Sequence, residues 1–133
     1  MQLAVAASLR NGYADPQSSR MIFAFVEDGS LQVKRDLREV RRDFEAVDVE
    51  NLVVTFYDDK GHPLAPVFTK PNRRRKLLGF LVSLEQGEFE LEPTRDPTWD
   101  PIEVALNETV TLEPNPFFSS IEQVRTHLLR AQD

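Results

Sequence analysis

The sequence has 133 residues, 41% hydrophobic and 29% charged, which fits a folded globular chain and is too apolar for a disordered one. The absence of cysteine excludes disulfides, thiolate metal sites and thiol catalysis. The net charge of −6 is uneven, because residues 1–84 hold 13 Lys/Arg and 11 Asp/Glu whereas residues 85–133 hold 3 and 11. We predict a single domain over residues 1–133, with an acidic half that disfavours general binding to nucleic acid or anionic lipid.

The amino-terminal segment has no secretion or membrane signature. It lacks a basic start, and no apolar run in the chain approaches the roughly 20 residues of a transmembrane helix. Alternation over Leu3–Leu9 favours a strand over a short helix. We therefore expect a cytoplasmic protein with no membrane contact.

A hairpin and then a helix are predicted next. The apolar run Met21–Val26, the turn at Asp28-Gly29 and the alternation around Leu31 and Val33 predict the hairpin. From Asp36 the period changes, and apolar residues recur on one stripe of a helix that we place at about residues 36–47.

More strands are expected in the middle of the chain. Leu52–Tyr57 and Leu64–Phe68 predict a second hairpin, and Pro66 places its second strand at a sheet edge or a bulge. The apolar run Leu77–Leu84 is typical of a central strand, and Glu88–Glu92 alternates as a strand with its carboxylates toward water.

The last third of the sequence shows alternation first and a helical period after it. Ile102, Val104 and Leu106 alternate, as do Val110 and Leu112, which predicts another hairpin; residues 120–131 begin with capping-box spacing and predict a helix. Hairpins with two helices, instead of regular strand-helix alternation, indicate an α+β fold: a mostly antiparallel sheet with the helices on one face.

Catalytic residue types are scarce. The chain has two histidines and five glycines, and no phosphate-binding loop or nucleophile elbow. Asp58, Asp59 and His62 offer one possible hydrolase or cation site, but Asp, Gly and Pro around them are what a turn requires. We therefore expect no enzyme activity, no cofactor and no metal site.

A basic segment covers residues 70–76 and is predicted to be a loop between two strands. Its five cations are Lys70, Arg73, Arg74, Arg75 and Lys76. They offer an alternative function, the binding of nucleic acid or phosphate as an accessory protein, although basic residues beside an apolar strand also serve solubility.

The acidic stretch from Glu85 to Glu113 has nine carboxylates and a single opposing Arg95, with Trp99 among them. Such a surface steers a basic protein, and an aromatic anchor supplies the desolvated contact. The sequence therefore favours a non-catalytic protein-binding domain, an immunity or antitoxin-type inhibitor of a basic enzyme such as a nuclease toxin. The predicted partner-binding residues are Glu88, Glu90, Glu92, Asp96, Trp99 and Asp100.

Self-association is also open, because an edge strand or the basic segment of one copy can meet the acidic face of another. A homodimer is therefore a further possibility.

Overall fold

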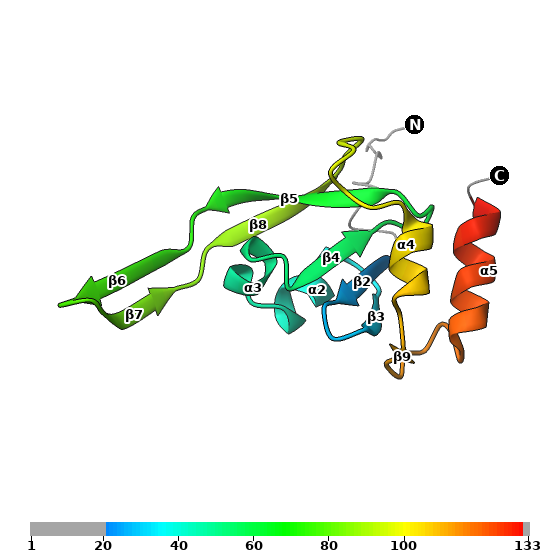
Figure 1. Ribbon diagram of the computed structural model, residues 1–133, viewed down its shortest axis with the longest axis horizontal. Helices are drawn as coiled ribbons and strands as arrows, with labels where there is room; N and C mark the ends of the chain where they lie inside the picture. Colours follow the sequence, from blue (N-terminus) through cyan, green and yellow to red (C-terminus); the bar gives the residue numbers. More distant parts are fainter. Residues whose placement is uncertain (1–20, 132–133) are drawn as a thin grey trace, which may run out of the picture.

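The computed structural model describes residues 21–131, so the strand predicted at Leu3–Leu9 lies outside it. A six-stranded sheet forms the centre of the molecule, in the order β8-β5-β4-β2-β3-β9 (Figure 1). All neighbouring strands are antiparallel except β3 and β9. The strands are β2 Ile22–Val26, β3 Ser30–Lys34, β4 Val54–Tyr57, β5 Pro63–Lys70, β8 Glu88–Pro93 and β9 Thr111–Leu112. The predicted α+β class and both early hairpins are confirmed.

Helices cover both faces of this sheet, so the prediction of helices on one face is wrong. On β2, Ile22 and Ala24 pack against α2 (Leu37–Asp43) and α3 (Ala46–Glu50). Their neighbours Phe23 and Phe25 point the other way and pack against α4 (Ile102–Asn107) and α5 (Ile121–Ala131). A strand buried on both faces reads as a continuous apolar run, which is the pattern of Met21–Val26.

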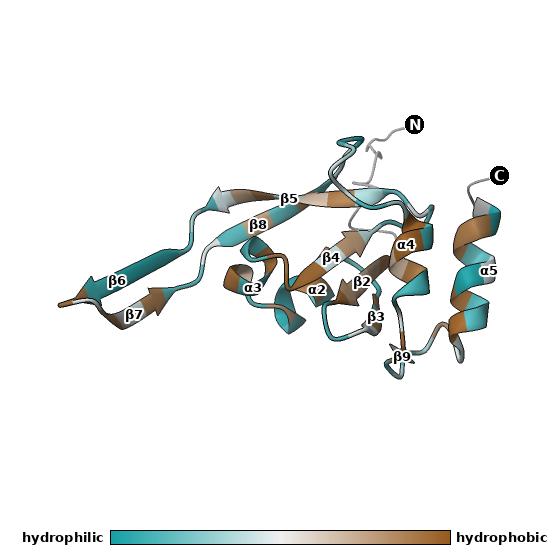
Figure 2. Ribbon diagram, viewed as in Figure 1, coloured by the Kyte–Doolittle hydropathy of each residue, from teal (hydrophilic) through white to brown (hydrophobic). Residues whose placement is uncertain are grey.

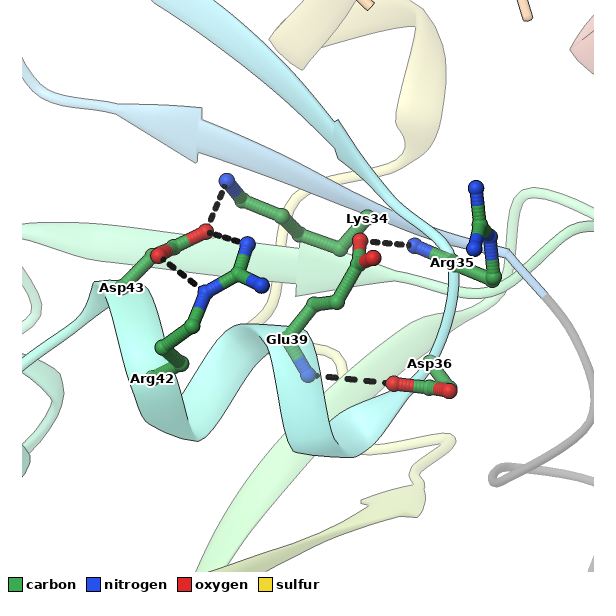
Figure 3. A network of polar contacts seen from close by, with 6 residues as sticks. All are labelled: Lys34, Arg35, Asp36, Glu39, Arg42 and Asp43. Atoms are coloured by element: carbon green, nitrogen blue, oxygen red, sulfur yellow. Dashed lines mark hydrogen bonds and ion pairs between the residues drawn. The ribbon is translucent and has the colours of Figure 1, made fainter. Parts of the chain in front are cut away.

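The helix predicted at residues 36–47 is two helices. Asp36 caps the first by accepting the backbone N–H of Glu39 at 3.0 Å, and Glu39 in return accepts that of Arg35 at 2.8 Å (Figure 3). The first helix ends at Phe44, whose extended backbone turns its ring onto Phe56 at a centroid distance of 5.7 Å. Packing of one aromatic ring therefore overrides the helical period at this point.

The hairpin predicted over residues 102–112 is wrong. Ile102 and Leu106 are buried on α4, four residues apart on one helical face, while Val104 between them is 37% exposed. A spacing of four fits both a strand and a helix, and here burial against β2 selects the helix. Only Thr111–Leu112 is extended, as the short parallel edge strand β9.

The terminal helix is confirmed, with its capping box formed by Ser119, Ser120 and Gln123. Pro66 lies beyond the part of β5 that pairs with β4, since that pairing ends at Leu64, so at Pro66 the strand β5 has only β8 as its partner among the described strands.

Within residues 21–131 no helix has both the length and the apolar character that a bilayer crossing requires.

Leu77–Leu84 is not a central strand, and residues 70–76 are not a loop. Lys70 ends β5, and Arg73–Leu77 (β6) pairs with Phe80–Glu85 (β7) in a separate two-stranded ribbon. This ribbon continues the line of β5 and β8 away from the body (Figure 1). We call residues 73–85 the arm and the other described residues the body.

Candidate functional site

The predicted partner-binding residues do not all line one hollow of the surface. Glu88, Glu90 and Glu92 are strung along the edge strand β8, where Glu88 stands opposite Lys70. Glu90 already binds Arg41 at 2.6 Å, and the same guanidinium also donates to the carbonyl of Phe89. Of these three carboxylates, Glu90 is therefore already engaged within the protein, by the guanidinium of Arg41.

Trp99 and Asp100, in contrast, line a cleft of about 540 Å³ beside the sheet and α4. Two further carboxylates, those of Glu27 and Glu108, line it as well. We call this hollow the acidic cleft, because no Lys, Arg or His lines it and none of its three carboxylates forms an ion pair within residues 21–131. Its walls include the aromatic residues Phe25, Tyr57 and Trp99.

Tyr57 lines the acidic cleft and is held in place by two contacts. Its hydroxyl donates to the backbone carbonyl of Asp100 at 2.6 Å, and its ring meets Phe25 edge-on at 5.3 Å. Burial raises the pKa of Tyr57 to about 12, with the charges of Asp100 and Glu108 adding to the effect. The negative charges of the cleft thus disfavour ionisation of the Tyr57 hydroxyl.

Leu52 forms part of the cleft wall in a strained conformation. It follows α3 with φ of 59°, and its N–H donates to Val49 while that of Val53 donates to Asp48, the pattern of a Schellman cap. Glycine is usual at this position because a side chain is disfavoured there. Leu52 is nevertheless 55% exposed, so its side chain gains little from the core.

The other predicted sites are explained by local structure. Asp96 accepts the backbone N–H of Thr98 at 3.0 Å, and hydrogen bonding with Thr98 lowers the pKa of the Asp96 carboxyl. Asp58 accepts two backbone N–H groups within its own turn, those of Lys60 and His62. Asp96 is therefore a turn residue at the edge of a second hollow that it shares with Trp99.

The Asp58, Asp59 and His62 cluster is not assembled as one group. Asp58 lies 3.5 Å from His62, but Asp59 binds His127 on α5 at 2.5 Å. His127 is packed on the ring of Phe118 at a centroid distance of 5.4 Å, so this pair ties α5 to the turn between β4 and β5. Within residues 21–131 no three metal-ligating side chains are grouped together.

The predicted basic residues lie mainly on the arm, where every residue of β6 is exposed. Arg74 reaches Glu50 on α3 at 3.5 Å, and Arg73 is 4.0 Å from Glu85. Arg75 and Lys76 form no ion pair with any described residue. Positive charge is therefore unneutralised toward the far end of the arm.

The tip of the arm is apolar and strained. Leu78 and Gly79 have φ of 53° and 81°, as in a type I′ turn, and the ribbon at the outer end of the arm has the colour of hydrophobic residues (Figure 2). Asn or Gly is the usual first residue of such a turn. The exposed fractions are 64% for Leu77, 90% for Leu78, 74% for Phe80 and 54% for Leu81.

The arm is anchored to α3 at its root. Asn72 donates to the carbonyl of Ala46 and accepts the N–H of Gly87, while the Gln86 side chain accepts the N–H of Val47 at the start of α3. A Cβ on Gly87 would lie 2.1 Å from the carbonyl oxygen of Lys70, so only glycine fits. These contacts fix the direction of the arm relative to the body.

Sequence reasoning found Trp99 and Asp100 but missed Glu27, Leu52 and Glu108, because their positions come together only through the sheet order. The one signal in the sequence that could have pointed to these surfaces was an unusual residue at a turn position, such as Leu78 before Gly79.

Comparison with family models, curated proteins and solved structures finds no match to this chain.

Proposed function

We propose that this chain is a non-catalytic protein-binding domain of the immunity or antitoxin type, which holds a basic segment of a partner enzyme in the acidic cleft. The observation that carries this proposal is the lining of the cleft, where Glu27, Asp100 and Glu108 lie with aromatic walls and where residues 21–131 contribute no basic side chain. A cation is attracted both to carboxylates and to the face of an aromatic ring.

The mechanism is occlusion. A nuclease-type enzyme needs basic residues to hold the phosphates of its substrate. When the cleft carboxylates engage those residues, the substrate loses its binding site. The acidity of residues 85–133 assists by steering the basic partner toward the cleft, which raises the association rate at low salt.

Trp99 provides the test, because it is the only tryptophan in the chain. We expect an oligoarginine peptide to change Trp99 fluorescence, and an oligoglutamate peptide of equal length to leave it unchanged. The double variant Asp100→Lys/Glu108→Lys should weaken oligoarginine binding by about tenfold or more, since it replaces attraction by repulsion. Binding of both peptides, or an unaltered affinity in the variant, would contradict the proposal.

The ionisation of Tyr57 gives a second measurement of the same cleft. Its pKa of about 12 reflects burial and the carboxylates nearby. A bound guanidinium favours the charged phenolate, so oligoarginine should lower this pKa, as followed by the ultraviolet absorbance of tyrosinate. The Tyr57→Phe variant identifies the signal by removing it, and an unchanged titration of Tyr57 with saturating peptide would argue against a cation in the cleft.

A further inference from the structure

The arm presents an apolar tip and basic flanks to solvent. Leu78 and Phe80 are 90% and 74% exposed, and Arg75 and Lys76 lack ion-pair partners among the described residues. A two-stranded ribbon by itself is marginally stable in water, and a contiguous exposed apolar patch marks an interaction site. A surface that is apolar in part and otherwise acidic would complement the arm.

The body of the same protein carries such a surface. The acidic cleft combines three carboxylates with aromatic walls, and Leu52 on its wall is 55% exposed. Val110 follows the cleft residue Thr109, and its backbone N–H donates to the carbonyl of Gly29. Val110 is 76% exposed. The chemistry of the cleft thus complements that of the arm in both charge and apolar character.

The arm does not reach the cleft of its own molecule. It extends the line of β5 and β8 away from the body, whereas α4, which borders the cleft, lies at the other end (Figure 1). Its direction is held by the contacts of Asn72 and Gln86 with α3. Contact between the two surfaces consequently joins two molecules.

Backbone strain links these two surfaces independently of charge. Among the described residues, the only non-glycine residues with positive φ are Leu52 and Leu78, one on the cleft wall and one at the arm tip. Glycine or asparagine would relieve the strain at either position. Two exposed leucines kept in unfavourable conformations indicate a role in contact instead of a role in folding.

We propose that the arm of one copy docks in the acidic cleft of a second copy, with its apolar tip on the apolar wall and its basic residues among the carboxylates. This inference rests on the proposed function, because it names a second copy as an occupant of the same cleft. Docking also gives the cleft a competitor, so a basic partner has to displace the arm before it binds.

Light scattering on the full chain tests the contact. At low salt the mass should rise with concentration above the 15.3 kDa of one chain, and high salt should return it to one chain. Arg75→Glu/Lys76→Glu on the arm and Asp100→Lys/Glu108→Lys in the cleft should each leave a single chain. An equimolar mixture should then regain mass, because each variant repairs the other's charge.

A matched control reverses two exposed cations of the body, Arg38→Glu/Arg130→Glu, and should leave self-association unchanged. Far-ultraviolet circular dichroism verifies that every variant is folded. A single chain at all concentrations of the native protein, or a mixture of the two variants that stays monomeric, would overturn the proposal.

Leu78→Asn separates contact from folding. Asparagine suits the first position of the turn, so the thermal midpoint should rise, while the concentration needed for self-association should increase several-fold because the apolar tip is lost. A residue with a purely structural role would move only the midpoint. Unchanged self-association in this variant would refute docking through the tip.

The same variants distinguish failure of this inference from failure of the proposed function. If the native chain is monomeric but oligoarginine still changes Trp99 fluorescence, the second copy is excluded and the cleft stands. If the peptide binds neither the native chain nor the monomeric variant Arg75→Glu/Lys76→Glu, whose cleft is free of the arm, both fall. A low-salt electrophoretic shift of RNA or DNA that Arg75→Glu/Lys76→Glu abolishes, with no self-association, would instead assign the arm to nucleic acid.

Discussion

The body and the arm are built on opposite principles. In the body, residues such as Phe23, Phe56 and Leu91 are at most 1% exposed, and both faces of the sheet are covered by helices. In the arm, the apolar residues Leu78 and Phe80 remain in solvent. Apolar content therefore does not by itself indicate a core, and the apolar residues of the arm are better understood as contact surface.

The largest expected difference between the two regions is the cost of removing an aromatic ring. Phe56→Ala should lower the free energy of unfolding by about 3–5 kcal/mol, because it leaves a cavity beside Phe44. Phe80→Ala should change it by about 0.5 kcal/mol or less. Denaturant titration measures both, and equal costs would remove the distinction between body and arm.

Gly87 sharpens the comparison at the junction. A methyl group there meets backbone atoms of Lys70 and Pro71, which cannot move like a flexible side chain. Gly87→Ala should destabilise the protein by about 1–3 kcal/mol and displace the arm root from α3. Hydrogen exchange at Val47, whose N–H binds Gln86, should accelerate; protection equal to that of the native chain would show that the root does not depend on this contact.

The charged network around Asp43 on the body predicts that the stability of the fold depends on pH in acid. Asp43 binds Arg42 and Lys34, and these partners hold the pKa of its carboxyl well below the usual range (Figure 3). The stabilisation is present above the unfolded pKa of about 3.9, and it is lost as pH falls from there through the lower folded value.

Removal of this carboxylate should therefore matter only above that acidic window. Asp43→Asn should lose about 1 kcal/mol near neutral pH and almost nothing in strong acid, a modest value because Arg42 is largely exposed. Urea midpoints at several pH values measure the difference. A constant difference across the window would mean that the network contributes through packing and not through charge.

The smallest expected effect is a gain. Leu52→Gly relieves the positive φ after α3 and should stabilise the body by about 0.5–1 kcal/mol. Because the same side chain lines the acidic cleft, binding of oligoarginine or of a second copy should weaken at the same time. Thermal unfolding measures the gain in stability, and light scattering on the same sample measures the loss of self-association. A loss of stability would show that Leu52 supports the fold.

Local patterns were sufficient for the elements in which one period dominated. The hairpins around Asp28-Gly29 and Gly61 and the terminal helix followed from turn residues, alternation and capping. Local patterns failed where two periods fit the same residues, as at Ile102 and Leu106. They also failed where the packing of an aromatic ring, that of Phe44, ended a helix. Burial against distant strands decided those cases.

The candidate site was harder to predict than the fold. Trp99 and Asp100 drew attention through composition, but Glu27 and Glu108 come from a strand end and a helix end that only the tertiary fold brings together. The arm was misread because an exposed apolar strand has the same sequence signature as a buried one. Residue types therefore located charge correctly, but they did not show which apolar residues stay in solvent.

The irregular register between Arg75 and Lys76 has a consequence for solubility. In the described structure β6 and β7 each have only one strand partner, so both outer edges of the arm carry backbone groups that another ribbon could extend into a fibril. A bulge bends such an edge, and a row of like charges on β6 repels a second copy of itself. We therefore expect the basic strand to disfavour amyloid-like stacking of the exposed arm.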